Sequence, residues 1–551
     1  MNILKTNFMR QFSAFFLLLM ATMPACRAYD FAQATPSGHS LYYAVSDSLW
    51  HEVTVVWPNS KAERLADLYD GFTKPSGHLE IPAYVVNAGV RYSVTGIASA
   101  FAFCDALESV SIPATVVWIG PDAFSHCASL RSAPLPSNLL TIGDRAFDRC
   151  SSLAGSLQIP ATVTAIGEGA FAGCLSLSGP LTLPQGLEQL GRSAFAECSG
   201  FSGNLLIPVS IAEVPDYAFF RCSGFSSLTI PRGIKAIGDN AFASCAALSG
   251  TLTIPATVTY VGEHAFDGCT GFTGRLVLPA TLSEIRSYAF AGCSGITSVS
   301  LPAALMVIEP YLFDGCSALK GQLVIPSRVQ DIQEYAFRGC VGLTGTLSIP
   351  SSVWRIKGHA FENCTAISAL RLPTSLQVIG DYAFSRCEEL LGKLVIPAGL
   401  TIVGDHAFAH CDKLLAVDIS RTVTSIGADA FGSCAKLATY TVAPANKRYT
   451  SHDGMLYSSL ADTLFACPTA RAGSLTIPQQ VKVIHNFALH NCTELTDVYI
   501  AGPVRVIGDY AFAGCSGITG TITIPKSVKS VGRKAFEGCG RFPDTIVIQE
   551  D

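Results

Sequence analysis

The chain has 551 residues, of which 49% are hydrophobic and only 14% are charged, and its formal net charge is −5 at pH 7. This charge balance excludes the basic surface that nucleic-acid-binding proteins need, so we expect no nucleic-acid partner. The length alone would suggest several domains. An internal repeat leads to a different interpretation, and the segments are taken here in chain order.

Residues 1–28 have the pattern of a secretory signal peptide. A short basic start precedes the apolar run 12–20, and small residues follow. We predict cleavage after Ala28. The alternative is a lipoprotein-type cut that leaves a lipid anchor on Cys26. No later stretch has the length of a membrane-spanning helix, so we expect a protein exported to the cell surface (the outer membrane) or secreted.

Residues 29–97 lack the repeat and have the alternation of short β-strands. Strands are predicted at residues 41–45, 53–57, 78–81 and 90–94, with Gly, Pro and Asn between them. A stack of coils leaves an open edge at its first coil, and such edges are usually covered. We therefore predict an N-terminal β cap.

Residues 98–443 consist of fifteen coils of 23 or 24 residues each, and three more follow within residues 475–551. One coil begins at Ile254-Pro255, turns at Gly262, and continues to Phe266 and Cys269. The Phe and Cys positions recur in almost every coil. A period of this length indicates a solenoid in which each coil buries the apolar face of its neighbours. We count 18 coils.

Within a coil, the residue pattern predicts one short strand and one turn. Residues 110–112 alternate apolar, polar and apolar, which indicates a strand that Pro113 ends. Val116 and Ile119 then point inward, and Phe124 fills the core. Stacked coils would place these strands in one parallel sheet.

The two coil lengths have a single source. The segment from Pro to Phe is constant, whereas the segment from Cys to Pro has nine or ten residues. Because Gly adopts positive φ without strain, we predict a bulge at a Gly that marks the longer coils. These glycines are Gly155, Gly179, Gly203, Gly250, Gly274, Gly321, Gly345, Gly392 and Gly520.

Cysteine occurs 20 times, which in an exported protein would normally indicate disulfides. Here nearly all cysteines hold the same place in successive coils. Side chains in such a column run parallel and do not face one another. We therefore predict free, buried thiols that act as small apolar side chains, and no zinc site, because no two cysteines have ligand spacing.

Residues 444–474 interrupt the repeat. Strands are predicted at residues 449–451, 455–457 and 464–466, with a tight turn at Asp453-Gly454. We interpret this segment as a β-hairpin insertion. The coils beside it are less regular, since Ser420 and Ala501 replace the usual Pro and Leu489 replaces the Phe.

The coil that contains Ile254-Pro255, Ala265-Phe266 and Cys269 resembles the BspA-type leucine-rich repeat of bacterial surface proteins. The insertion around Asp453-Gly454 resembles the hairpin common in that family. The resemblance implies a β-rich, right-handed solenoid, export, cell-surface display and binding of host or bacterial macromolecules, extracellular-matrix proteins included. It implies no enzyme activity and no cofactor, and it transfers no binding residue.

The exposed middle position of the predicted strands is the candidate binding face. It is flat, small and nearly uncharged, and a later member, Tyr499, is its one aromatic side chain. The candidate residues are Thr253, Val277, Ser300, Val324, Ser348, Arg371, Val395 and Asp418. The insertion and the cap are alternative binding sites, since loops outside a repeat often carry function.

No catalytic or metal site stands out. His406 and His410 are four residues apart, but the segment lacks the Glu of a metalloprotease motif. Histidines and tyrosines recur two residues before the Phe, which we interpret as a half-exposed packing column. We predict a non-enzymatic protein that binds extracellular or surface proteins, host matrix proteins among them, in adhesion. The alternative is a carbohydrate-binding protein for glycan capture.

Overall fold

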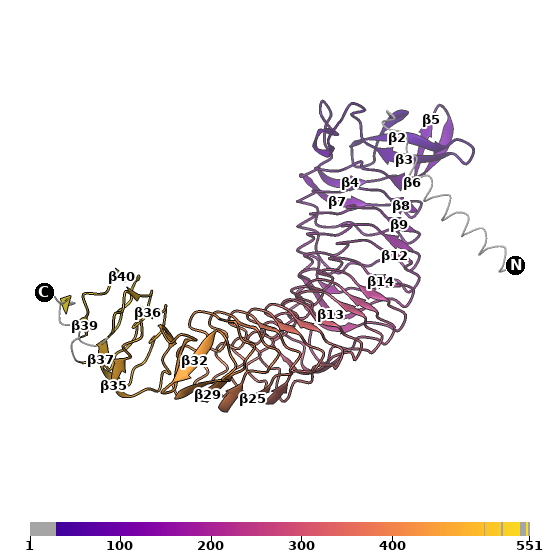
Figure 1. Cartoon of the computed structure of the whole chain (residues 1–551). Coiled ribbons are helices and arrows are strands. Elements are labelled where there is room, and N and C mark those ends of the chain that lie inside the picture. Colours follow the sequence, from indigo (N-terminus) through magenta and orange to yellow (C-terminus); the bar gives the residue numbers. More distant parts are fainter. Residues whose placement is uncertain (1–28, 501, 520–521, 540–546, 549–551) are drawn as a thin grey trace. The chain divides into compact units, whose positions relative to one another are not determined.

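The computed structural model describes residues 29–500, 502–519, 522–539 and 547–548 (Figure 1). These residues form short β-strands joined by turns, together with one 3-10 turn at Leu65–Asp67. The chain divides into two compact units, Met1–Ser202 and Gly203–Asp551. The predicted signal peptide with Cys26, and also Ala501 and Gly520, lie outside the described residues.

Six strands form the N-terminal part of the first unit. They are β1 (Phe31–Ala34), β2 (Ser40–Asp47), β3 (Glu52–Val56), β4 (Gly77–Glu80), β5 (Tyr84–Asn87) and β6 (Val90–Ile97). The four predicted strands are confirmed as β2, β3, β4 and β6, while β1 and β5 were not predicted. The C-terminal end of β6 pairs in parallel with Trp118 and Ile119, so the sheet of this segment continues directly into the first coils.

A row of two-residue strands just before the coil's turn forms the most continuous ladder, and we call its members rungs. In the first unit the rungs are β8 (Trp118–Ile119), β9 (Thr141–Ile142), β10 (Ala165–Ile166) and β12 (Gln189–Leu190). In the second unit they are β14 (Glu213–Val214), β16 (Ala236–Ile237), β17 (Tyr260–Val261), β19 (Glu284–Ile285), β21 (Val307–Ile308), β22 (Asp331–Ile332), β24 (Arg355–Ile356), β26 (Val378–Ile379), β28 (Ile402–Val403), β30 (Ser425–Ile426), β36 (Val483–Ile484), β38 (Val506–Ile507) and β40 (Ser530–Val531).

The predicted strand before the Pro forms a second row. Its members are β7 (Leu107–Ser111), β11 (Gly179–Pro180), β13 (Phe201–Leu206), β15 (Phe225–Thr229), β18 (Gly274–Val277), β20 (Ile296–Ser300), β23 (Gly345–Ser348), β25 (Ile367–Arg371), β27 (Gly392–Val395), β29 (Leu414–Ile419), β31 (Thr439–Val442), β35 (Gly473–Ile477), β37 (Leu495–Ile500), β39 (Thr523–Ile524) and β41 (Val547–Ile548). Within the first unit, Figure 1 shows β4 and β7 on the opposite side of the stack from β8, β9 and β12.

The predicted parallel pairing in this second row is confirmed, but the row is divided into several short sheets. The strands pair only in twos and threes, such as β18 with β20, whereas rungs β21 to β30 form a six-stranded sheet. The reason lies in the coil lengths. The rung belongs to the segment of constant length, so its register repeats in every coil. The other row follows the segment of variable length, so its register shifts.

The predicted positive φ is confirmed at each Gly of the longer coils that the structure describes. Gly274 has φ +78° and Gly345 has φ +76°. The pairing register shifts between Gly274 and Arg275 and again between Gly345 and Thr346. In both pairs the residue that the register skips belongs to the partner strand, Thr297 in β20 and Ser368 in β25. The bulge itself therefore lies opposite the Gly, whose positive φ costs little because Gly has no Cβ.

The core of each unit is built from columns of identical side chains. Successive Phe rings within a unit stack with centroids 5.1 to 5.6 Å apart, as from Phe313 through Phe337 to Phe361. All described cysteines are free thiols, as predicted. The thiol of Cys340 donates to the Phe313 carbonyl of the preceding coil at 3.3 Å, and this contact recurs along the column. A thiol thus fills the space and satisfies a buried carbonyl as well.

The insertion contributes a coil of its own. It contains β32 (Tyr449–His452), β33 (Met455–Ser458) and β34 (Thr463–Ala466), close to the predicted strands. Asp453 and Gly454 both have positive φ, as a tight hairpin turn requires. Because β34 pairs in parallel with β36, it serves as a rung. The described solenoid therefore has about 19 turns, one more than the sequence count.

Candidate functional site

The eight predicted face residues lie on the outward side of the second strand row, all within the second unit, and we call this surface the strand face. Strand side chains alternate between the two sides of the backbone. In β18 this alternation buries Leu276 and exposes Val277 by 52%. Val324 and Val395 are also exposed, as are Thr253, Ser348 and Arg371, whereas Ser300 and Asp418 are half-buried.

Register brings most of these residues beside one another across neighbouring coils. Direct partners are Thr253 with Val277, Val277 with Ser300, Val324 with Ser348, Ser348 with Arg371, and Val395 with Asp418. The strand face is therefore a physical surface and not only a sequence pattern. Its successive members are separated by the spacing of adjacent strands, about 4.8 Å.

A second exposed row runs beside the predicted one, and sequence reasoning missed it. It lies two residues earlier on each strand. Its exposed members are Thr251, Arg275, Gln322 and Lys393, whereas its other positions are half-buried. The alternation of strand side chains was the signal that could have found it. Lys393 Nζ lies 2.7 Å from Asp418 Oδ2. Arg275 and Arg371 have no ion-pair partner among the described residues, so the face carries a small positive charge.

The strand face suits an extended macromolecule more than a small substrate. It mixes hydroxyl groups with isolated valines, and the aromatic side chain that continues the row, Tyr499, is 63% exposed. Among the described residues, no group of three or more His, Cys, Asp or Glu side chains is placed to hold a metal ion. Within the same residues, no helix has the length and apolar character needed to cross a membrane.

On another side of the same coils, seven rings form a continuous stack that we call the ring column. Its members are His264, Tyr288, Tyr311, Tyr335, His359, Tyr382 and His406. Neighbouring centroids are 4.2 to 4.8 Å apart. The predicted half-exposed packing column is confirmed, but the stacking was not foreseen, and Tyr311 had not been assigned to it.

Each residue of the ring column has a positive φ, between 54° and 61°. This conformation costs a side-chain-bearing residue about 1–2 kcal/mol, which is of the same order as the about 0.5–1.5 kcal/mol of an aromatic pair. Stacking therefore offsets the strain of the turn. Because each ring face is covered by its neighbours, the column shows mainly ring edges to solvent. It does not offer the open aromatic faces on which sugars stack.

His406 and His410 lie in a turn, not on a helix, with φ values of 54° and 58°. His406 Nδ1 is 3.4 Å from Asp429 Oδ2. This contact raises the pKa of His406, and burial opposes the shift less strongly. The histidine thus has a structural carboxylate partner.

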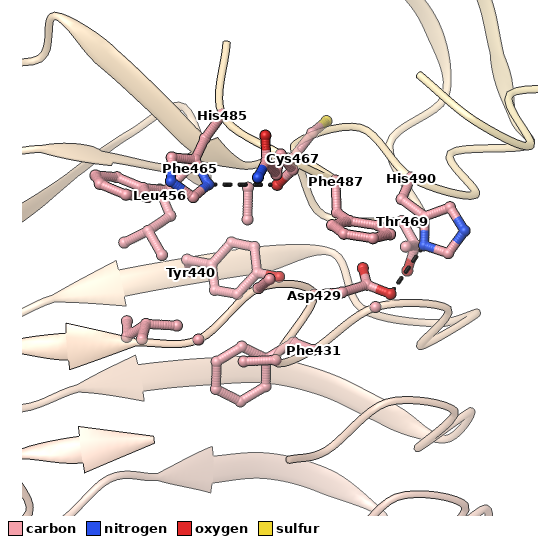
Figure 2. A pocket seen from close by; sticks show the side chains of 17 residues that line it. Asp429, Phe431, Tyr440, Leu456, Phe465, Cys467, Thr469, His485, Phe487 and His490 are labelled. Atoms are coloured by element: carbon pink, nitrogen blue, oxygen red, sulfur yellow. Dashed lines mark hydrogen bonds and ion pairs between the residues drawn. The ribbon is translucent and has the colours of Figure 1, made fainter. Parts of the chain in front are cut away.

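A small cavity lies where the insertion meets the neighbouring coils (Figure 2). Its lining includes Asp429, Tyr440, Phe465, Phe487 and His490. The volume of about 30 Å³ has room for roughly two water molecules. Pockets for organic ligands usually measure about 300–1,000 Å³, so this cavity is a packing feature of the insertion. Burial raises the pKa of the Tyr440 hydroxyl.

Comparison with known proteins places these features in context. The profile of a family described as "BspA type Leucine rich repeat region (6 copies)" matches residues 94–199, 154–273, 248–365, 343–452 and 456–542. These matches cover most of the chain. A search of curated proteins found no match.

Two solved structures with similar chains are bacterial. A leucine-rich repeat protein from Bacteroides ovatus is 26% identical with a TM-score of 0.56, and the match covers 75% of this chain and 94% of the other. A leucine-rich cell surface protein from Faecalibacterium prausnitzii is 22% identical with a TM-score of 0.32, and the match covers 86% of this chain and 95% of the other. The first of these supports the solenoid fold.

Proposed function

We propose, from the premise that this chain belongs to the BspA-type leucine-rich repeat family of bacterial surface proteins, that it is exported to the cell surface and binds other proteins there through the strand face. The repeat forms a scaffold on which many coils present equivalent side chains. Adhesion to host or bacterial proteins, matrix proteins included, is the role that such a scaffold would serve.

The observation that carries this proposal is the exposure of Val277, Val324 and Val395 at the same position of the repeat, each paired in register with a polar residue of the next coil. Exposed apolar side chains that recur in a regular array favour contact with another macromolecule. Weak contacts repeated over several coils add up when one partner spans them. Arg275 and Arg371 add donors for carboxylates on that partner.

Glycan capture is the competing function, and the strand face gives it little support. Sugar-binding surfaces usually present open aromatic faces, whereas this surface carries Thr, Ser and Val, with Tyr499 beyond its far end. The ring column does not supply such faces either, because its rings cover one another. Protein binding therefore ranks first.

The experiment is capture of surface-exposed proteins and of polysaccharides by the fragment 29–551. Val324→Arg and Val277→Arg would place bulky charges on the strand face, and we expect each to reduce capture of a protein partner at least tenfold. Ile402→Arg is the matched control, because Ile402 is an exposed aliphatic residue of a rung, 41% exposed. Equal capture by all variants would contradict the proposal, and capture of polysaccharide alone would favour the competing function.

The insertion can be tested only by point substitution. Met455, Tyr457 and Leu464 are each no more than 2% exposed, so deletion of residues 444–474 would open the core and not simply remove a binding loop. Leu460, by contrast, is 80% exposed at the turn after β33. If Leu460→Arg abolished capture while Val324→Arg did not, the binding site would be the insertion.

A further inference from the structure

Large apolar side chains are unusually exposed in the N-terminal cap, residues 29–97. Leu49 is 81% exposed, Trp50 is 74% exposed and Val86 is 56% exposed. Leu49 and Trp50 are adjacent, in the turn between β2 and β3. Exposed apolar side chains scattered singly are ordinary, but a tryptophan beside a leucine at the tip of a hairpin needs an explanation.

The turn that presents these two side chains is held by its own hydrogen bonds. Asp47 Oδ1 accepts from the backbone N–H of Leu49 at 2.8 Å and from that of Trp50 at 2.9 Å. His51, with φ 53°, ends the turn, and its ring lies edge-on against Tyr92 at 5.6 Å. Because the backbone is already ordered, docking would cost little conformational entropy.

The described chain begins at the same edge of the cap. Strands β1 and β2 are antiparallel with Phe31 opposite Tyr43, and the Val45 N–H donates to Asp30 Oδ2 at 2.7 Å. Tyr29 and Asp30 therefore lie beside the part of β2 that leads to Leu49. Cys26, the alternative lipid site, is three residues before Tyr29, a span of at most about 10 Å.

The turn between β5 and β6 reaches the same edge. Strand β6 runs parallel to β3 with Glu52 opposite Ser93, so the start of β6 and the turn that precedes β3 lie at the same edge of the sheet. Val90 is opposite Asn87 in the β5–β6 hairpin. This places Val86 one residue from the edge that Leu49 and Trp50 occupy.

We propose that this edge of the cap docks on a phospholipid bilayer, with Trp50 and Leu49 inserted at the level of the lipid headgroups. Trp is favoured at the membrane–water interface because its ring is apolar and its N–H is polar. The edge would then set the orientation of the first unit, with the cap on the membrane and the coils of that unit directed away from it.

The exported chain itself favours a bilayer over a protein as the occupant. Residues 12–20 form an apolar run, and the mature chain would start at residue 26 or 29. Tyr29 and Asp30, the first residues that the structure describes, lie at the same edge of the cap as Leu49 and Trp50. The inference rests on the surface display in the proposed function, but it does not depend on what the strand face binds.

The test measures quenching of Trp50 by lipid. The fragment 29–551, with a hexahistidine tag before Tyr29, is held on vesicles that contain nickel-chelating lipids and phosphatidylcholine with brominated acyl chains. Bromine quenches only tryptophans that reach the bilayer. The chain has four tryptophans, so the difference in fluorescence emission between the wild type and Trp50→Phe gives the emission that comes from Trp50. We expect brominated lipid to quench the emission that comes from Trp50, and we expect no quenching by brominated lipid in Trp50→Phe.

Two controls establish that the quenching is specific to Trp50 and independent of protein capture. Trp354→Phe removes a tryptophan of the second unit that is 37% exposed, and it should leave the quenching intact. Val324→Arg should also leave it intact, even where it abolishes protein capture. An unquenched wild type, or equal quenching in Trp50→Phe, would overturn the proposal. If Trp50→Asp abolished protein capture while quenching was absent, the edge would be a protein-binding site instead.

Discussion

His490 Nδ1 lies 2.9 Å from Asp429 Oδ2, although the two residues are 61 positions apart in the chain. Asp429 belongs to the last coil before the insertion and His490 to the coil after it. Figure 2 shows this ion pair at the rim of the small cavity. His406, from the preceding coil, approaches the same carboxylate at 3.4 Å. One buried carboxylate therefore connects the coils on both sides of the insertion.

The first prediction is that Asp429 makes stability depend on pH. Burial alone would raise the pKa of Asp429, but its hydrogen bonds with His406 and His490 outweigh burial and lower it. This contribution is present above the unfolded pKa of about 3.9 and is lost as the pH falls through the folded value. The raised pKa of His406 adds stability below about pH 6.5, which is lost as the pH rises through its folded value.

The ion pairs should therefore stabilise the second unit most between about pH 4 and 6.5. We expect Asp429→Asn to lower the unfolding free energy by about 1–2 kcal/mol at pH 6 and by less at pH 8.5. Denaturant unfolding of both proteins at the two pH values measures this difference. A destabilisation of equal size at both would show that the charge of Asp429 has no role.

The second prediction concerns the Phe column. Phe337 is fully buried between Phe313 and Phe361, with centroids 5.6 and 5.4 Å away. Phe337→Ala should cost about 3–5 kcal/mol through the cavity that it leaves. Because each coil contacts mainly its neighbours, the loss should stay local. Hydrogen exchange should accelerate in the adjacent coils and not near Phe124, whereas acceleration throughout the chain would contradict a one-dimensional array.

The third prediction is that the native thiols react slowly. Burial raises the pKa of Cys316 and Cys387 to about 12, and the thiolate is the reactive form. Cys539 is half-buried, and its pKa is lowered by a hydrogen bond with Cys515. A thiol reagent should therefore modify Cys539 first, and Cys539→Ser should remove this early phase. Fast reaction of many thiols before denaturant is added would contradict the buried column.

The fourth prediction tests the Gly bulge. Gly345 has φ +76°, and a Cβ there would meet nothing within 4 Å. Gly345→Ala should cost about 1–2 kcal/mol through backbone strain alone. Gly186→Ala is the matched control, because Gly186 is equally open but is not in the left-handed region. We expect it to be neutral or slightly stabilising in thermal unfolding, and equal effects of the two substitutions would refute the strain argument.

The sequence by itself determined the features that repeat in every coil. The positions of Phe337 and Cys340, the positive φ of Gly345 and the exposure of Ser348 all follow from one period. Each coil stacks on a near copy of itself, so a side chain meets the same neighbours wherever it recurs. Spacing along the chain was then sufficient to predict the packing.

The tertiary structure decided the features that break the period. It also decided which of the two strand rows in a coil pairs more continuously. The rungs form the more continuous sheet because only their segment has constant length. The insertion supplies a further rung through β34, and Asp429 finds His490 across it. The Leu49–Trp50 edge gathers strands that only sheet register brings together. None of these contacts has a fixed spacing in sequence, because each depends on where the backbone returns after a non-repeating segment.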